Sequence, residues 1–285
     1  MRGELNSILR WEGEAPAEPS GSYQVELKVR PFGTQARQKP RPPKMRRHCQ
    51  LTRITQPPQR NSPRARLVKK KRRKPRLLQY YRNYLLDEDT AGFVRDVAEQ
   101  YSLATLARLA EDGARLARRA AVLALGMLGD YRVNRVLGEA LRDKDRGVRL
   151  VADQALREIW LRDGNDAQQK KLRIAVRLNH LFQFDDAIAS TDSLIVEAPW
   201  LAEAYHQRGI ARACLGHYEE ALLDFHQTLE LNAYHFPAAA AMGQAYLELH
   251  DSADALVCFR RALKLNADLE GVRARVLQLQ RQVDE

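Results

Sequence analysis

The sequence of 285 residues has few of the patterns that mark enzymes or disulfide-bonded domains. Its three cysteines, Cys49, Cys214 and Cys258, are widely spaced and form no CxxC pair, which argues against a disulfide framework or zinc site and indicates a reducing compartment. A glycine-rich phosphate loop, a GxSxG elbow and an HExxH motif are also missing. We therefore expect no catalytic residues, no cofactor and no metal, and predict that the chain is not an enzyme.

Long apolar runs are also missing. The longest apolar stretch, residues 120–129, is too short to cross a bilayer, and no run of seven or more apolar residues follows the first charges after Met1. We expect no transmembrane segment and a cytoplasmic location. Met45 offers a second place where translation could start, and the sequence leaves both starts open.

Six of the seven histidines lie in the C-terminal part of the chain, which raises the question of a metal site. No two of these histidines are three or four residues apart on one expected helix, and we expect no carboxylate to complete a ligand set. We interpret them as scattered polar positions: His180, His206, His217, His226, His235 and His250.

Charge and proline divide the chain near residue 76. Residues 1–86 carry 22 Lys and Arg against 5 Asp and Glu, whereas the rest of the chain has an acidic excess. Ten of the twelve prolines precede residue 76, and only Tyr23–Val29 alternates like a strand. We therefore predict that residues 1–76 form a disordered, Pro-rich basic arm.

The end of this arm is its most basic part, with nine cations in thirteen residues. Such a run binds phosphate polymers by releasing counterions, without reading their sequence. Three interpretations stay open: a solvated tail or localisation signal, a nucleic-acid or ribosome contact, and an anionic membrane surface. The candidate nucleic-acid-binding residues are Arg64, Arg66, Lys69, Lys70, Lys71, Arg72, Arg73, Lys74 and Arg76.

The C-terminal part of the chain is built from repeats of equal length. Ala187, Ala221 and Ala255 are evenly spaced, which defines a 34-residue step, and small and bulky residues recur with the same step at other positions. A repeat of this length is a helical hairpin, which must stack on its neighbours to bury its apolar face. A stripe ending this part, from Leu269 to Val283, predicts a C-terminal capping helix.

The middle copy resembles the tetratricopeptide repeat, and the resemblance covers roughly residues 168–285. The residues that carry it are Tyr205, Gly209, Gly216, Tyr218, Ala221 and Phe225. The first copy departs from the pattern at Arg173, Ile174, Ala175 and Thr191, and the third copy at His250 and Ser252. Small residues such as Gly209 and Ala221 are expected where the two helices of a hairpin cross.

The resemblance implies that the first helix of each hairpin lines a concave, protein-binding groove. Some family members grip a chain-terminal carboxylate there with cationic residues, but Leu172, Val176, Gln207 and Ala241 stand at the corresponding positions. An amphipathic helix or an extended apolar peptide is the better match. The candidate groove residues are Leu172, Val176, Asn179, His180, His206, Ile210, Ala213, Cys214, Ala240, Gln244, Leu247 and Glu248.

A second periodicity, with a 31-residue step, precedes the first. It aligns Asp112 with Asp143 and Arg118 with Arg149, and it resembles short HEAT-like repeats, in which such pairs hold neighbouring repeats in register. Just upstream, an apolar cluster is expected to cap the first of these helices: Tyr80, Tyr81, Tyr84, Leu85 and Leu86.

Together these patterns predict an all-α, right-handed α-solenoid. Residues 77–163 would form HEAT-like repeats, and residues 164–285 three tetratricopeptide hairpins with a capping helix, in one continuous stack. The predicted function is a non-enzymatic scaffold that binds a protein or peptide in its concave face, with a basic arm for electrostatic attachment. The alternative is a nucleic-acid- or ribosome-associated adaptor whose arm supplies most of the affinity.

Overall fold

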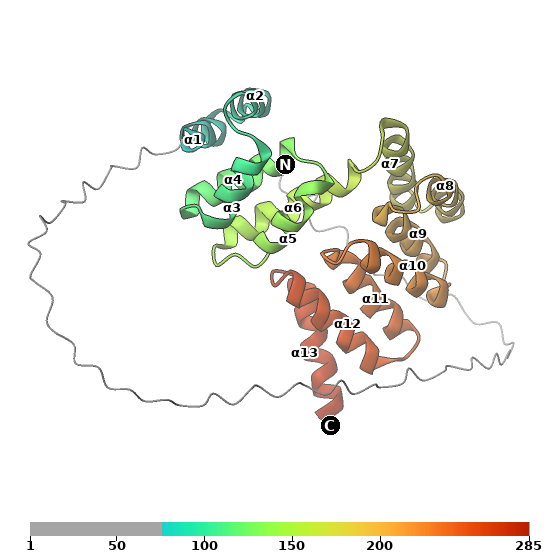
Figure 1. The fold of residues 1–285 in the computed structure, drawn as a ribbon. Coiled ribbons are helices and arrows are strands. Elements are labelled where there is room, and N and C mark those ends of the chain that lie inside the picture. Colours follow the sequence, from blue (N-terminus) through green and yellow to red (C-terminus); the bar gives the residue numbers. More distant parts are fainter. Residues whose placement is uncertain (1–75, 285) are drawn as a thin grey trace, which may run out of the picture. The chain divides into compact units, whose positions relative to one another are not determined.

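The computed structural model describes residues 76–284, and the side chains of residues 76–281. These residues belong to one compact unit, and every regular element among them is helical (Figure 1). The strand-like segment Tyr23–Val29, the thiol of Cys49 and the basic arm before Arg76 lie outside the described residues. No helix of the described part is both long and apolar enough to cross a membrane.

The N-terminal part of this unit contains six α-helices and one short 3₁₀ helix. Helix α4 carries the long apolar stretch noted in the sequence, and its residues Ala120, Ala121, Ala124 and Leu125 are fully buried. The elements are α1 (Leu77–Asp87), α2 (Thr90–Gln100), α3 (Leu103–Asp112), α4 (Arg115–Leu128), η1 (Tyr131–Val133), α5 (Asn134–Ala140) and α6 (Arg146–Leu161).

The C-terminal part contains three helical hairpins and a final helix. The hairpins are α7 (Asp166–His180) with α8 (Phe184–Glu197), α9 (Ala202–Cys214) with α10 (Tyr218–Leu231), and α11 (Phe236–Glu248) with α12 (Ser252–Leu265); α13 (Glu270–Asp284) follows.

The hairpins repeat one backbone geometry at the predicted step. Phe182, Gly216 and His250 occupy the turns between paired helices, and all three have a left-handed φ, of 59°, 82° and 60°. Glycine adopts a left-handed φ without steric cost, whereas the Cβ atom of Phe or His makes this conformation less favourable. Hairpin packing therefore sets the turn conformation, even where the local residue disfavours it.

Small residues stand where the paired helices cross, as the sequence predicts. A Cβ atom on Gly209 would lie 2.6 Å from the Phe225 ring, and one on Gly243 would lie 2.6 Å from the Phe259 ring. Both distances are too short for a real contact, so these two glycines allow the helices to approach closely. Ala221 on α10 is fully buried.

Arginine–aspartate pairs join successive helical pairs in the N-terminal part. Arg118 on α4 donates two hydrogen bonds to Asp143, which precedes α6, and a third to the carbonyl of Gly113. The predicted structural role of this arginine and of Asp143 is confirmed. Asp112 is exposed, and none of the described residues forms an ion pair with it.

Three short loops follow α8, α10 and α12 at one edge of the hairpins, and we call residues 198–201, 232–235 and 266–269 edge loops 1, 2 and 3. Their first residues, Ala198, Asn232 and Asn266, have nearly the same φ, between −133° and −139°. The three loops therefore begin with a similar backbone turn, but they differ in what covers them.

Helices α5 and α6 pack against edge loops 2 and 3. Asn134 donates a hydrogen bond of 2.9 Å to Asn232 in edge loop 2, and Asn266 in edge loop 3 donates one of 2.6 Å to Asp153 on α6. The side chains of α1–α6 consequently share one apolar core with α10–α13. The first hairpin instead has a separate core, which includes Leu172.

The predicted helical solenoid is confirmed, and α6 contacts α7 and α9 as a continuous stack requires. In addition, α5 and α6 lie along the edge of the second and third hairpins, a contact that the repeat pattern did not predict. This contact buries apolar side chains in a shared core, and the edge-loop asparagines supply hydrogen-bond partners for Asn134 and Asp153.

Both ends of the described unit carry the expected caps. At the N-terminal end Tyr81 is buried and the Tyr84 ring lies 5.2 Å from the Phe93 ring, but Leu85 and Leu86 are exposed and take no part. At the C-terminal end the predicted stripe of α13 packs on α12 through Val272, Val276 and Leu279, whereas the side chain of Val283 lies outside the described residues.

Candidate functional site

The predicted groove residues lie on α7, α9 and α11, the first helices of the three hairpins. They differ in accessibility. His180 and Glu248 are exposed, and three are buried, namely Leu172, Asn179 and His206. The remaining seven are half-buried: Val176, Ile210, Ala213, Cys214, Ala240, Gln244 and Leu247.

The seven half-buried members and the exposed His180 and Glu248 are accessible to a ligand, and most of the half-buried ones are apolar. Burial raises the pKa of the Cys214 thiol to about 11, so this cysteine is an uncharged, weakly polar part of the surface. That these residues form a binding surface stays a prediction.

The candidate nucleic-acid-binding residues fall almost wholly outside the described part of the chain. Of the nine, only Arg76 is described. Its guanidinium is exposed and lies 3.4 Å from the side-chain oxygen of Gln100 on α2.

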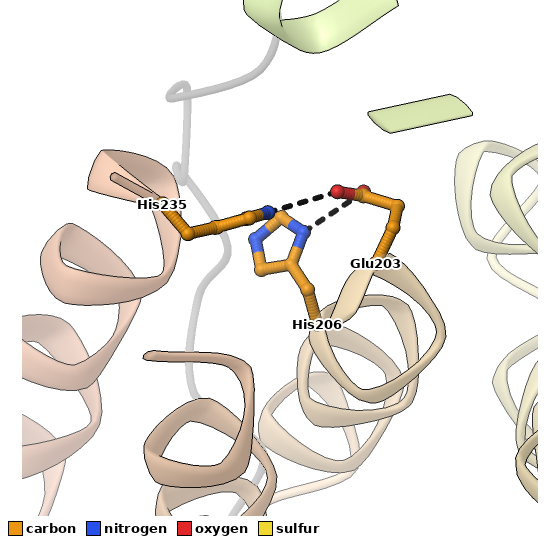
Figure 2. Close-up of side chains that lie close together, drawn as sticks. All are labelled: Glu203, His206 and His235. Carbon is orange, nitrogen blue, oxygen red and sulfur yellow. Dashed lines mark hydrogen bonds and ion pairs between the residues drawn. The ribbon is translucent and has the colours of Figure 1, made fainter. Parts of the chain in front are cut away.

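A buried polar cluster lies beside the groove, where the second and third hairpins meet. The carboxylate of Glu203 on α9 contacts His206 Nδ1 at 3.0 Å and His235 Nε2 at 2.8 Å (Figure 2). Gln207 donates a further hydrogen bond of 2.7 Å to the same carboxylate. All four side chains are more than nine-tenths buried, so this carboxylate depends on protein donors in place of water.

The cluster extends in both directions through neighbouring elements. Toward the first hairpin, Asn179 on α7 donates to Gln207 at 2.9 Å. Toward the N-terminal helices, the ring of His235 stacks on Trp160 of α6 with 4.3 Å between centroids, and Trp160 donates to Asn134 at 2.8 Å. One buried chain of contacts therefore links all three hairpins to α5 and α6.

Burial and hydrogen bonding set the charge states within the cluster. Burial and the neighbouring His206 lower the pKa of His235 to about 4, so His235 is neutral at pH 7. Burial alone would raise the pKa of Glu203, but His206 and His235 together hold it well below its usual range. The carboxylate is therefore ionised and the imidazole of His235 is not.

The donor set of Glu203, His206 and His235 has the composition of a metal site, since their ligand atoms lie within 4.8 Å of one another. His235 does not fit that role. Its Nδ1 atom accepts a hydrogen bond of 3.1 Å from the backbone N–H of Ala238, so the ring proton is on Nε2, the atom that faces Glu203. A metal on Nε2 would move that proton to Nδ1, against the N–H of Ala238. We interpret the cluster as a hydrogen-bonded carboxylate.

Sequence reasoning missed this cluster, and the interpretation of His206 and His235 as scattered was wrong. It also held that no carboxylate completes a set with the histidines. The available signal was Glu203, three residues before His206 on one helix face. His235 comes from the next hairpin and Trp160 from α6, so no local spacing could have placed either one there.

Comparison with known proteins gives one match among curated sequences. The chain is 30% identical over 92 residues to the "Hsp70-Hsp90 organizing protein" of Triticum aestivum, and the match covers 32% of this chain and 16% of the relative. This similarity accompanies three evenly spaced hairpins with glycines at two of their helix crossings. This arrangement is the one that the resemblance to tetratricopeptide repeats predicts.

No family model matches this sequence. Two solved structures are similar to it at low TM-scores. The structure described as "TPR2AB-domain:pHSP90-complex of yeast Sti1" has a TM-score of 0.38 at 15% identity, and covers 73% of this chain and 96% of its own. A thermophilic tetratricopeptide protein of Thermus thermophilus has a TM-score of 0.32 at 20% identity, covering 72% of this chain and 96% of its own.

Proposed function

We propose that this chain is a non-enzymatic protein-interaction scaffold. In this proposal the concave face of its tetratricopeptide hairpins binds an amphipathic helix or an extended apolar peptide. The observation that carries the proposal is a half-buried, mostly apolar strip on adjacent first helices, including Val176 on α7, Ile210 on α9 and Leu247 on α11. Such a strip can bind the apolar face of an amphipathic helix, because binding would remove apolar surface of the groove and of the helix from water.

The proposed partner is not a chain-terminal carboxylate. The positions where related proteins place cationic residues hold Leu172, Val176, Gln207 and Ala241, and Leu172 is fully buried. The name of the wheat relative refers to Hsp70 and Hsp90, but the chain spans 16% of that protein's length. The proposal therefore rests on the chemistry of this surface alone.

The polar cluster supports this proposal in a structural role. It holds α9 to the start of α11 through Glu203 and His235, so it fixes the spacing between two of the helices that line the groove. A groove that keeps its shape before binding loses less conformational entropy on association.

The test is partner capture from a native extract with the full chain and two matched variants. Ile210→Gln places a polar group in the groove, whereas Leu223→Gln makes the same kind of change at an exposed residue of α10. The Ile210 variant should lose its partner at about 0.3 M salt, where exposed charge contacts are largely screened, and the Leu223 variant should keep it. Equal capture by the two variants would overturn the proposal.

A second candidate function is a nucleic-acid- or ribosome-associated adaptor, supported by the nine cations of the basic arm. Binding through phosphates weakens steeply with salt, with a slope of roughly −5 to −8 in log affinity against log salt for six to nine phosphate contacts on duplex DNA. Loss of every partner by the unaltered chain at about 0.3 M salt would favour this function. A cytoplasmic location is proposed with either function.

A further inference from the structure

Edge loop 1 differs from edge loops 2 and 3 in what covers it. Trp200, Tyr234 and Asp268 hold the same position in the three loops, since each follows the one before by one full repeat. Tyr234 packs against α5, and Asp268 pairs with Arg149 of α6 at 2.8 Å. Trp200 remains 56% exposed, and Val196 one turn earlier is 84% exposed.

The covered loops show what this edge binds. The Tyr234 ring lies directly on the backbone of α5 at Gly138, where a Cβ atom would overlap the ring. Two residues that flank α5 donate hydrogen bonds to carbonyl groups at the C-termini of α10 and α12. Tyr131 donates to the carbonyl of Leu231 at 3.2 Å, and Arg142 donates to the carbonyl of Lys264 at 3.1 Å. Edge loop 2 therefore binds a helix that has a glycine against its aromatic ring, and residues flanking that helix supply a hydroxyl or guanidinium donor to a helix C-terminus.

The same contacts are open at edge loop 1. Its inner residues Ala198 and Leu201 are buried in the core of the first hairpin, against which Leu161 at the end of α6 packs. Its outer residues are uncovered because α5 packs on edge loop 2 and α6 pairs with edge loop 3. Among the described residues, no side chain from outside α8 donates to the last carbonyl groups of that helix.

We propose that edge loop 1 is a docking site for a helix of a partner protein, which would continue the line of α5 along this edge. The helix would place a glycine against Trp200 and an arginine or tyrosine donor at the C-terminus of α8. Since Ala198 replaces the asparagine of the other loops and is already buried, edge loop 1 offers no hydrogen-bond partner for a residue like Asn134, and the partner helix would contact the outer residues of the loop. This site is separate from the concave groove, and it stands or falls independently of the function proposed above.

Continuity with the α5 interface is the argument for this occupant. A fully buried tryptophan removes about 150 to 250 Å² from water, and since Trp200 is 56% exposed, docking would bury roughly half of that area. Tryptophan is also among the residues that most often dominate interface energies. The alternative occupant is a second copy of this chain, whose own α5 is already engaged by its edge loop 2.

The probe is a helix-stapled, fluorescent peptide of residues 130–143 carrying Asn134→Ala. In the intact chain α5 and α6 occupy edge loops 2 and 3, which leaves edge loop 1 for the peptide. Anisotropy should show saturable binding below about 1 mM. Trp200→Ala should weaken it at least about tenfold. Leu223→Ala, at an exposed residue elsewhere, should change it less than about twofold. A peptide carrying Gly138→Leu should not bind.

Three results would overturn the proposal: no saturable binding, equal binding to the Trp200 and Leu223 variants, or a chain dimer that Trp200→Ala dissociates. The last result would assign the loop to a second copy. Both substitutions are at exposed side chains, and unchanged melting temperatures would show that the variants fold.

Discussion

Arg149 on α6 holds Asp268 in edge loop 3 with the same pattern of hydrogen bonds by which Arg118 on α4 holds Asp143. In each pair Nε and Nη2 donate to the two carboxylate oxygens, at 2.8 and 2.9 Å for Arg149 and at 2.6 and 2.8 Å for Arg118. The Nη1 atom of each arginine donates to a backbone carbonyl just before its own helix. The acceptor is the carbonyl of Asp143 for Arg149 and that of Gly113 for Arg118. Edge loop 3 therefore packs on α6 in the same way as the turn before α6 packs on α4.

Breaking this pair should destabilise the fold. Both side chains are about four-fifths buried, and bidentate charged hydrogen bonds of this kind contribute more than exposed ion pairs. In a double-mutant cycle with Arg149→Ala and Asp268→Ala, we expect a coupling of about 1–2 kcal/mol in the free energy of unfolding by urea. The same cycle on the exposed pair Arg132 and Asp130 should give a much smaller coupling, because solvent screens these charges. Similar coupling in the two cycles would contradict the structural role.

Gly138→Ala should lower stability, although alanine is the better helix former by about 1 kcal/mol. The added Cβ would overlap the Tyr234 ring and force α5 away from edge loop 2, at a cost of about 1–3 kcal/mol. Gly271→Ala in α13 is the control, because its Cβ would meet no atom within 4 Å and should not destabilise. Thermal unfolding compares the two, and a more stable Gly138 variant would show that α5 does not pack on Tyr234.

Glu203→Gln should be strongly destabilising. The substitution removes the charge that three donors share and turns an amide N–H₂ group toward at least one of those donors in a buried site. We expect a loss of about 2–4 kcal/mol in the free energy of unfolding. Glu219→Gln, at an exposed residue of α10, should change it by less than about 0.5 kcal/mol. A near-neutral Glu203 variant would mean that the cluster contributes little to stability.

Stability should fall as the pH drops from 7 to 5, and His235 should account for part of this loss. The folded pKa of His235 is lowered to about 4, below the unfolded value of 6.5, so the unfolded chain takes up the proton first. The contribution of neutral His235 to the free energy of unfolding is complete above pH 6.5, the pKa in the unfolded chain. It is lost as the pH falls toward about 4, the pKa of His235 in the folded protein. One such group contributes about 1–2 kcal/mol over this interval.

The variant His235→Asn separates this effect from the titration of other groups. Asparagine can still accept the N–H of Ala238 at the start of α11 but has no proton to gain. Its free energy of unfolding should therefore depend less on pH between 7 and 5 than that of the unaltered chain. An identical pH dependence in the two proteins would place the titration elsewhere.

Much of the fold could be predicted because helical hairpins impose a local repeat. The longer repeat step located Gly209 at a helix crossing, and the shorter step located Arg118 and Asp143 at a joint between helical pairs. The apolar stripe of α13 was predicted from side-chain spacing alone, since apolar residues on one face of a helix recur every three or four positions.

The contacts between distant segments could not be predicted in this way. Asp268 pairs with Arg149 across the boundary between the two repeat types, and His235 stacks on Trp160 across the same boundary, so neither pairing leaves a periodic signal. The accessibility of the groove residues depended on the same contacts. Asn179 and His206 stand at groove positions by repeat register, but the polar cluster takes up their side chains.

The anchoring of α6 to edge loop 3 has a consequence for how the protein is made. On a ribosome the N-terminal helices emerge first, at about 5–20 residues per second, but the carboxylate that Arg149 requires is synthesised 119 residues later. Until then the face of α6 that packs on edge loop 3 is uncovered, although α5 can already pack on edge loop 2. A nascent chain stalled before residue 266 should therefore expose this face to chaperones and proteases, and release past residue 269 should end that vulnerability.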